Sequence, residues 1–467
     1  MTYQTVNPAT GEVLATYANA TDRELEASVA QAHETFATDW RHRPVEARAA
    51  IISAAAALLR TRSEEYARHL TLEMGKLIAE ARAEVALSAD ILDYYAGKAA
   101  DYLRPRTLPG SPGAELHVEP IGVILAIEPW NFPYYQVARV AGPQLMVGNV
   151  LLLKHAEIVP RSALALARLF EEAGAPAGVY TNLFAGIEQI GRVIEDPRVR
   201  GVTVTGSERA GAAVAERAGR SLKKSVMEMG GSDPLIVLED APLASALDGA
   251  LFGRMFNAGQ CCVGSKRIIV VGRTRGRAFL EGLVDRMNAL RAGDPGAPGT
   301  TLAPLASEKA LNLLLDQIES ARLGGARVAC GGNRVDRPGF YLEPTVLADV
   351  APDNPVYTQE LFGPVAAFHV VESEEEAIRL ANATPFGLGA SVFTADVERG
   401  RALAAEIESG MVFINQPAWT AAELPFGGVK NSGFGRELSE LGLREFVNEK
   451  LVNVAPAGAP PWGPVAA

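Results

Sequence analysis

Two adjacent cysteines in a turn of small residues are the strongest candidates for reactive side chains in this chain. Cys261 and Cys262 stand in the stretch N-A-G-Q-C-C-V-G, and the 467 residues contain only three cysteines. Neighbouring cysteines rarely form a disulfide, because that bond requires a Cα separation and a Cβ orientation that adjacent residues seldom provide. The pair therefore predicts either a thiol nucleophile or small buried side chains.

An amide and a carboxylate follow apolar strand patterns elsewhere in the chain. Asn131 lies in E-P-W-N-F-P, between a strand pattern and a helix that we expect to begin at Pro133. Its amide could donate to a developing oxyanion, or it could bond the backbone of a turn. Glu228 precedes two glycines in V-M-E-M-G-G. An apolar setting would raise its pKa into the range of a general base, whereas a strand end facing water would not.

Three further sites have the residue types that bind nucleotides. Lys154 ends an apolar strand pattern and precedes Glu157 by three residues, so the two could hold ribose hydroxyls or form a surface ion pair. Ser207 in V-T-V-T-G-S is a good N-cap for a helix whose N-terminus could bind phosphate. Glu360 and Phe362 stand in the turn sequence E-L-F-G-P. A full G-x-G-x-x-G fingerprint is absent, so each site is weak evidence by itself.

The elements that would position these residues follow a βαβ rhythm. Residues 22–104 form a helical pattern, broken near Pro44 and Gly75. Short apolar strands then alternate with helices, which predicts a mainly parallel sheet with helices on both faces. The expected strands of this first series are 121–127, 150–154, 180–184, 202–204 and 225–228. A second series begins at 235–238 and continues at 267–271, 365–371, 391–394 and 411–415.

Composition excludes several classes of protein. The net charge of −11 disfavours a nucleic-acid or anionic membrane surface as partner. No apolar run is long enough to span a membrane, no signal peptide is expected, and the few cysteines indicate a reducing, cytoplasmic compartment. The six histidines have no metal-ligand spacing, so no metal is expected.

Taken in order, these motifs resemble the NAD(P)-dependent aldehyde dehydrogenase family. The matching segments are P-W-N-F-P, K-x-A-E, T-G-S, E-x-G-G, G-Q-x-C, E-x-F-G-P-V and P-F-G-G-x-K-x-S-G-x-G-R-E, between residues 129 and 437. Any one motif is weak, but seven in the same order are specific. The resemblance implies a homodimer or homotetramer with a three-part α/β fold. Its three parts would be a Rossmann-like cofactor domain (1–99 and 120–230), a catalytic α/β domain (231–445) and a small antiparallel oligomerisation element (100–119 and 446–456). A flexible tail (457–467) would follow them.

The resemblance also implies roles for individual residues. Cys262 would attack the aldehyde carbon, and the Asn131 amide with the Cys262 N–H would stabilise the oxyanion. After hydride transfer, Glu228 would activate water to hydrolyse the thioester. Cys261 has no assigned step. The implied cofactor contacts are Ile127, Pro129, Trp130, Lys154, Ala156, Glu157, Gly206, Ser207, Glu228, Met229, Glu360 and Phe362.

Cofactor and substrate depend on individual side chains. Glu157 could accept the ribose 2′-hydroxyl of NAD and would repel the 2′-phosphate of NADP, which predicts a preference for NAD, with NADP possible. Arg139 shares a helix face with Tyr135, so it could pair with a distal substrate carboxylate or serve only the structure. The Y-Y-Q-V-A-R segment resembles the succinate-semialdehyde dehydrogenase branch, in its short bacterial form.

One loop departs from that branch and leaves other functions open. Residues 416–423, Q-P-A-W-T-A-A-E, include Trp419, which adds bulk, and Thr420, whose hydroxyl could replace a serine. A larger or neutral aldehyde is therefore an alternative substrate. A CoA-acylating aldehyde dehydrogenase and a non-catalytic binding scaffold are further alternatives. Glu228 favours hydrolysis over transfer to CoA, and the joint presence of Cys262, Asn131 and Glu228 argues against a scaffold.

Overall fold

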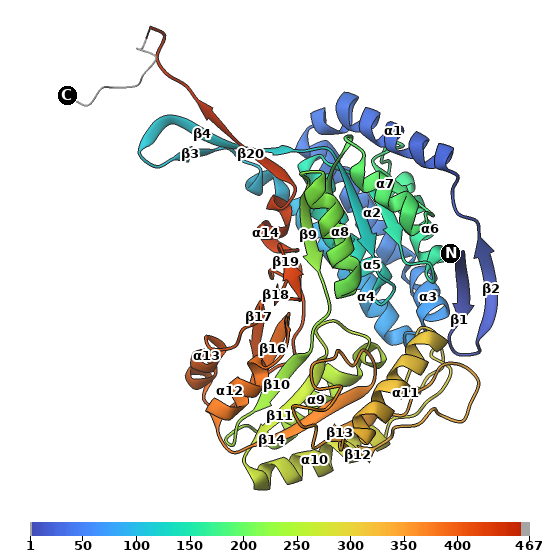
Figure 1. Ribbon diagram of the computed structural model, residues 1–467. Helices are drawn as coiled ribbons and strands as arrows, with labels where there is room; N and C mark the ends of the chain where they lie inside the picture. Colours follow the sequence, from blue (N-terminus) through green and yellow to red (C-terminus); the bar gives the residue numbers. More distant parts are fainter. Residues whose placement is uncertain (1, 459–467) are drawn as a thin grey trace.

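Two mainly parallel sheets and one small antiparallel sheet organise the chain. The computed structural model describes residues 2–458, and Figure 1 shows the first sheet in the upper lobe and the second in the lower. Figure 1 also shows the small sheet extending away from both lobes. The expected α/β class with a Rossmann-like part is confirmed.

The first sheet has a reversal of strand order that creates a ligand crevice. Its order is β19-β9-β8-β5-β6-β7, with β5 to β9 parallel and β19 antiparallel to β9. The chain runs outward from β5 through β6 and β7 and then returns to β8 on the other side of β5. In open α/β sheets, ligands bind at the carboxyl ends of the strands beside such a switch point. The strands are β5 (Val123–Glu128), β6 (Val150–His155), β7 (Tyr180–Asn182), β8 (Val199–Thr205), β9 (Lys224–Glu228) and β19 (Gly433–Phe434).

Helices surround this sheet, and one of them, α5, is completely buried. Every residue of α5 is buried, because α5 packs against α2, α4, α6 and the strands β5 and β6. A helix that is covered on all sides can hold a charged side chain only if the protein supplies a partner. The helices are α1 (Asp22–Thr38), α2 (Val45–Thr61), α3 (Ser63–Met74), α4 (Ile78–Tyr102), α5 (Pro133–Val147), α6 (Pro160–Glu172), α7 (Ile187–Glu195) and α8 (Glu208–Arg220), with a 3-10 turn η1 (Trp40–His42).

The second sheet forms the core of the other lobe. Its order is β12-β13-β14-β11-β10-β16-β17, and only β12 is antiparallel to its neighbour. The strands are β10 (Asp233–Val237), β11 (Ser265–Val271), β12 (Arg327–Cys330), β13 (Thr345–Ala348), β14 (Val365–Val371), β16 (Gly389–Phe393) and β17 (Met411–Ile414). The helical elements are α9 (Leu243–Met255), η2 (Phe256–Gly259), α10 (Arg273–Asn288), α11 (Glu308–Leu323), α12 (Glu374–Asn382) and α13 (Val397–Ala404). One apolar cluster packs α9 and α10 against the sheet, and another packs α12.

The small sheet joins two segments that are far apart in the sequence. Strand β4 (Ser111–Pro120) pairs with β3 (Arg106–Leu108) on one side and with β20 (Val447–Asn453) on the other, always antiparallel. Its outer surface carries apolar side chains, since Leu451 and Val454 are 60% and 69% exposed. The remaining pieces are α14 (Ser439–Arg444) and the pair β15 (Phe386–Gly387) and β18 (Val429–Lys430).

Some features differ from the sequence-based expectation or lie beyond it. The N-terminal hairpin of β1 (Tyr3–Asn7) and β2 (Glu12–Tyr17) was not anticipated. Its strands are short, and Tyr3 and Thr5 are buried by contacts with residues far along the chain, including Ala185 and Glu73. Of the tail predicted to be flexible, residues 459–467 lie outside the described part. Within residues 2–458, no helix combines the length and apolarity that a membrane crossing requires.

Candidate active site

A cavity of about 260 Å³ opens at the carboxyl ends of β5 and β8, beside the switch point. Ser207 caps the N-terminus of α8 there, its hydroxyl accepting from the Ala210 N–H at 3.4 Å. Free N–H groups and the helix dipole favour a phosphate at this end of α8. The lining residues are Pro129, Trp130, Asn131, Gln136, Thr205, Gly206, Ser207, Met229, Gly230, Cys262, Glu360 and Phe362.

Cys262 is presented by a loop with unusual backbone angles. Asn257, Ala258 and Gly259, which precede it, have φ of 56°, 51° and 73°. A Cβ on Gly259 would lie 2.2 Å from the Gly363 carbonyl oxygen, so only glycine fits there. The buried Lys266 ammonium donates to the Cys261 and Cys262 carbonyl oxygens at 2.8 and 2.6 Å. The loop is therefore fixed by residues on both sides of the cysteines.

The two neighbouring thiols shift each other's pKa in opposite directions. Hydrogen bonding of the Cys262 thiol to the Cys261 sulfur, followed by burial, raises the pKa of the Cys262 thiol well above its usual value. The same contact lowers the pKa of Cys261. The Cys262 thiol is therefore neutral at rest, and it would need a base before it could attack a carbonyl group.

Glu228 has the properties that this base requires. It ends β9, and neither carboxylate oxygen has a protein hydrogen-bond partner, although both are buried. Burial first, and then the negative charge of Glu437, raise the pKa of Glu228 well above its usual value, while Arg139 opposes that rise. An unpartnered carboxyl group of raised pKa can take a proton from a thiol or from water.

Asn131 faces the same cavity with its amide fixed. The Asn131 side-chain N–H donates to the Gln260 carbonyl oxygen at 3.0 Å, and Gln136 donates to the Asn131 side-chain oxygen at 2.9 Å. The second hydrogen of the amide has no such protein acceptor. An amide held this way can donate to an oxyanion formed on an aldehyde bound at Cys262.

A second, smaller cavity reaches Cys262 from the other side. Its volume is about 90 Å³ and its wall is almost entirely apolar. We call it the aldehyde chamber; it is lined by Ala83, Glu84, Leu87, Phe132, Tyr135, Phe256, Cys261, Cys262, Val263, Trp419, Thr420 and Phe426. Trp419 packs edge-on against Phe256 with ring centroids 5.3 Å apart. Tyr135 donates from its hydroxyl to the Thr420 hydroxyl at 2.7 Å, and the other polar side chain of the wall is Glu84, which is paired with Lys76.

The expectation that Arg139 lines the aldehyde channel is not met by this geometry. Arg139 is 1% exposed and forms an ion pair with Glu437 at 2.7 Å. The rings of Tyr135 and Phe426 stack on its guanidinium, with centroids 4.8 and 4.5 Å from Cζ, and these same rings line the chamber. The two aromatic rings therefore lie between the Arg139 charge and the chamber. The charge needs Glu437 as a partner, because an unpartnered guanidinium in a fully buried helix would cost too much free energy.

The predicted ribose contacts lie beside the cavity and not in its wall. Lys154 and Glu157 form an ion pair at 2.6 Å, and their side chains are 11% and 28% exposed. Ala156 packs near Trp130, and Ile127 packs near Met229. These residues border the same end of the sheet. The Glu157 carboxylate is paired with Lys154 through one of its oxygens.

Glu360 and Phe362 approach the cavity from the second lobe. Glu360 accepts from the Gly231 N–H at 3.1 Å and pairs with Lys266 at 3.1 Å. A Cβ on Gly230 would lie 2.2 Å from a Glu360 oxygen, which explains the glycine pair after Glu228. Phe362 packs edge-on against Trp130 at 5.8 Å.

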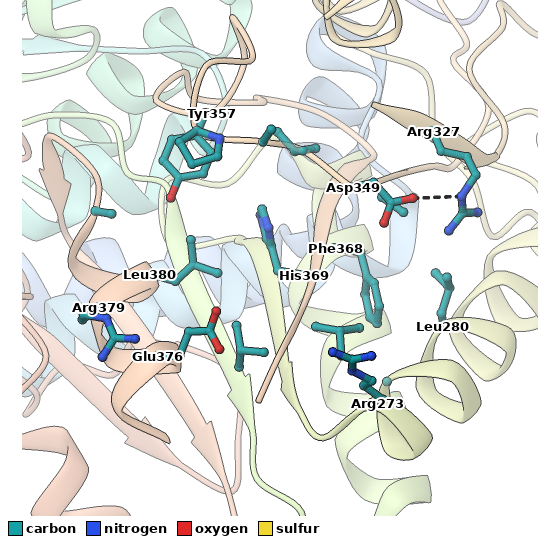
Figure 2. A pocket seen from close by; sticks show the side chains of 18 of the residues that line it. Arg273, Leu280, Arg327, Asp349, Tyr357, Phe368, His369, Glu376, Arg379 and Leu380 are labelled. Atoms are coloured by element: carbon teal, nitrogen blue, oxygen red, sulfur yellow. Dashed lines mark hydrogen bonds and ion pairs between the residues drawn. The ribbon is translucent and has the colours of Figure 1, made fainter. Parts of the chain in front are cut away.

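A larger cavity, of about 830 Å³, shares no lining residue with either of these two cavities. It surrounds the end of β14 between α10 and α12 in the second lobe. Figure 2 shows Arg327 of this cavity bonded to Asp349, and Arg273 is likewise paired with Glu372 outside it. It contains neither of the cysteines of the loop. No three or more His, Cys, Asp or Glu side chains among residues 2–458 are arranged to hold a metal ion.

Sequence reasoning missed several buried charged residues around the site. Lys76 and Lys266 are 0% and 1% exposed, and Glu84, Glu128 and Glu437 are 2–5% exposed. Glu437 ends the glycine-rich G-F-G-R-E motif, so its place in that motif could have indicated a role near the site. Lys76 follows the glycine that ends α3, and nothing in the local sequence indicates its partners.

Comparisons with known proteins give one consistent result. A model of the aldehyde dehydrogenase family matches residues 1–452. A succinate-semialdehyde dehydrogenase [NADP(+)] of Deinococcus radiodurans is 50% identical over 98% of this chain and 96% of its own length. Succinate-semialdehyde dehydrogenase [NADP(+)] 1 of Mycobacterium tuberculosis is 45% identical over 97% of this chain and all of its own.

The solved structures agree with the sequence relatives. The crystal structure of succinic semialdehyde dehydrogenase from Streptococcus pyogenes in complex with NADP+ superimposes with a TM-score of 0.95 at 47% identity. The match covers 97% of this chain and all of that one. A nicotinamide cofactor is thus supported, whereas the expected preference for NAD over NADP is not, because the names of these relatives specify NADP.

Proposed function

This chain belongs to the aldehyde dehydrogenase family, and we propose that it oxidises succinate semialdehyde to succinate with a nicotinamide cofactor through a covalent cysteine intermediate. The observation that carries this proposal is the position of Cys262, which lines both the aldehyde chamber and the cavity of about 260 Å³ at the carboxyl ends of β5 and β8, here called the cofactor cavity. The names of the relatives supply the substrate. The cavities supply separate approaches to one sulfur atom for the cofactor and for the aldehyde.

The chain's own residues account for each proton and charge. Glu228 takes the Cys262 proton, and the thiolate adds to the aldehyde carbon to form a thiohemiacetal whose oxyanion accepts from the Asn131 amide. A nicotinamide bound in the cofactor cavity supplies the acceptor for the hydride that leaves this carbon. The product is a thioester on Cys262. Glu228 releases the proton taken from Cys262 to solvent and then deprotonates water, whose attack on the thioester expels the Cys262 thiolate. The thiolate takes the proton back from Glu228, and the product leaves as the carboxylate after losing its own proton to solvent.

The fit of a nicotinamide cofactor rests on the cavity wall. The N-terminus of α8 faces the cavity at Gly206 and Ser207, where a phosphate would be stabilised. Trp130 and Phe362 supply flat apolar surface, and the Glu360 carboxylate supplies an acceptor for a hydroxyl group.

The test is steady-state and burst kinetics with 4-oxobutanoate, the aldehyde proposed above. Reduction of the cofactor should require Cys262, and Cys262→Ala should lose it almost completely. Mass spectrometry of quenched wild type should find an acyl group on the peptide that contains Cys262. Native activity in Cys262→Ala would overturn the mechanism, and formation of acyl-CoA in preference to the free acid would favour a CoA-acylating enzyme.

A second substrate class is favoured by the wall of the aldehyde chamber. The wall is mostly apolar and aromatic, Tyr135 and Thr420 contribute a neutral hydroxyl pair, and the Glu84 carboxylate is compensated by Lys76. The Arg139 charge is covered by aromatic rings and compensated by Glu437. Such a chamber accepts a neutral aldehyde without leaving a buried charge unpaired. We propose neutral aliphatic aldehydes as an alternative substrate, and butanal against 4-oxobutanoate compares equal chain lengths directly.

The finer choice of cofactor rests on the pair formed by Lys154 and Glu157. Because Lys154 compensates the Glu157 charge, repulsion of a 2′-phosphate is weaker than for a lone carboxylate. We therefore propose that both NAD and NADP are used. Glu157→Ser should raise kcat/KM for NADP relative to NAD, and an unchanged ratio would remove Glu157 from cofactor choice.

Assembly is proposed through the small sheet formed by β3, β4 and β20. It has two open edges and exposed apolar residues such as Leu451, and it extends from the body of the protomer. A homodimer or homotetramer would cover it. Light scattering after gel filtration should give a dimer or larger species, and Leu451→Asp should shift it toward monomer.

A further inference from the structure

Lys76 is a buried cation that none of the motifs includes. It stands in the short link between α3 and α4, and its side chain is fully buried. Its ammonium forms an ion pair with Glu84, donates to the Asn131 carbonyl oxygen at 3.1 Å and lies 3.8 Å from the centroid of the Phe132 ring. A charge is buried at high cost unless its partners compensate it. Two of these partners, Asn131 and Phe132, belong to the turn between β5 and α5, and the third, Glu84, bonds to the start of α5.

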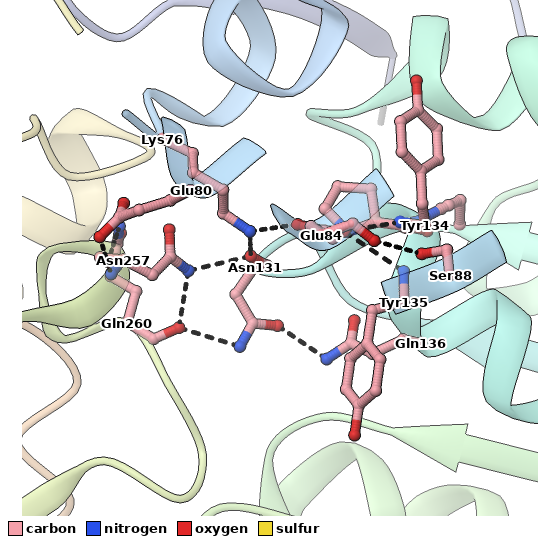
Figure 3. Close-up of polar contacts among 12 residues, drawn as sticks. Lys76, Glu80, Glu84, Ser88, Asn131, Tyr134, Tyr135, Gln136, Asn257 and Gln260 are labelled. Atoms are coloured by element: carbon pink, nitrogen blue, oxygen red, sulfur yellow. Dashed lines mark hydrogen bonds and ion pairs between the residues drawn. The ribbon is translucent and has the colours of Figure 1, made fainter. Parts of the chain in front are cut away.

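That turn joins β5 to α5 and carries Asn131. Glu84 accepts from the N–H groups of Tyr134 and Tyr135 at 2.9 and 3.3 Å, which satisfies donors at the N-terminus of α5. Lys76 holds Glu84 and the Asn131 carbonyl oxygen together, as Figure 3 shows. The ammonium therefore fixes the start of the helix and the peptide of Asn131 at the same time.

The same carbonyl oxygen is also tied to the cysteine loop. Asn257 donates from its side chain to the carbonyl oxygens of Asn131 and Gln260 at 2.9 and 3.1 Å. The Asn257 N–H donates to Glu80, a neighbour of Lys76 on α4, at 3.0 Å. Figure 3 shows these contacts as one continuous network. The main chain of Asn131 is thus located relative to both α4 and the loop that presents Cys262.

We propose that Lys76 is a positioning residue for the oxyanion-binding amide of Asn131. The proposal rests on the thiohemiacetal chemistry proposed above. An oxyanion donor is effective only at about 2.7–3.1 Å from the developing charge, and loss of one such donor costs about 10²–10³-fold in kcat. Removal of the ammonium would free the Asn131 peptide on one side, so that the amide no longer holds this position.

The test uses a pair of substitutions that removes both charges together. Lys76→Met alone would leave Glu84 as an unpaired buried carboxylate and could prevent folding. Lys76→Met with Glu84→Gln keeps the volumes and an acceptor for the α5 N–H groups. We expect this double variant to fold and kcat to fall at least about tenfold. Alkylation of Cys262 by iodoacetamide should keep its native rate, because alkylation forms no oxyanion.

A control on α3 separates position from stability. Glu73 is a buried carboxylate near Lys76 whose partners, Thr5 and Ser162, lie away from the chamber. Glu73→Gln should reduce thermal stability and leave kcat and the alkylation rate unchanged. If the double variant of Lys76 behaved in the same way as Glu73→Gln, Lys76 would serve only the fold and the proposal would be wrong.

Combination with Asn131→Ala tests the route of the effect. If Lys76 acts through the Asn131 amide, the double change at Lys76 and Glu84 should cause no further loss of kcat in the Asn131→Ala background. Independent, multiplicative losses would overturn the proposal. A failure of the proposed function is a different result, since wild type itself would then form no acyl group on Cys262.

Discussion

The ion pair between Arg139 and Glu437 decides whether Arg139 binds substrate or supports the site. Both side chains are buried, at 0% and 6% exposure, and their charges lie 2.7 Å apart. Loss of one partner from a buried pair costs about 3–5 kcal/mol, because the other charge remains unpaired. We therefore expect Arg139→Met to lower the free energy of unfolding by about this amount, measured by urea denaturation.

Arg139→Met and Glu437→Gln should move the pKa of Glu228 in opposite directions. Negative charge on Glu437 raises that pKa and positive charge on Arg139 lowers it. Arg139→Met should therefore shift the acid limb of the pH profile of kcat/KM to higher pH, and Glu437→Gln should shift it to lower pH. One pH unit corresponds to about 1.4 kcal/mol of interaction with the Glu228 carboxylate.

The control is a comparison of charged and neutral substrates. Because aromatic rings separate Arg139 from the chamber, Arg139→Met should affect 4-oxobutanoate and butanal to a similar degree. A selective rise of KM for 4-oxobutanoate by tenfold or more, with native stability and an unmoved pH profile, would refute this reasoning. Arg139 would then be the carboxylate clamp that the sequence suggested.

Three further outcomes test the site and its surroundings. Measured at high pH, where the Cys262 thiol ionises without a base, Glu228→Gln should still give a burst of reduced cofactor, but turnover should fall by about 10²–10⁴-fold as thioester hydrolysis loses its base. Equal loss of burst and turnover at that pH would contradict the role of Glu228 in hydrolysis. Burial raises the pKa of Asp233 to about 8, so the folded state binds a proton that the unfolded state has lost, and stability decreases as pH rises between about 4 and 8. Asp233→Asn should remove a slope of up to about 1.4 kcal/mol per pH unit in this window, measured by urea unfolding at several pH values; parallel pH dependences for variant and wild type would show that Asp233 does not titrate in this way. Trp419, which is 38% exposed and packs on Phe256, narrows the chamber, so Trp419→Ala should raise kcat/KM for 3-phenylpropanal relative to butanal, and an unchanged ratio would place substrate selection elsewhere.

Local sequence patterns determined the type of fold and the main reactive groups. Apolar runs alternating with helical patterns predicted parallel sheets, because strand and helix periodicities are properties of short segments. Glu228 follows one apolar strand pattern and precedes two glycines, and Asn131 follows another and precedes Pro133. The sequence therefore predicted that both lie at the same edge of the sheet, since the carboxyl ends of parallel strands meet there. The type of residue then indicated the chemistry.

Only the tertiary structure decided which charges are free to act. The sequence gives Arg139 and Glu157 the charges to bind a carboxylate and a ribose, but their partners Glu437 and Lys154 engage those charges. Lys76 and Asn131 are 55 residues apart and meet only because α4 packs against α5. Burial and long-range pairing set whether a charge is available, and neither can be read from a segment of chain by itself.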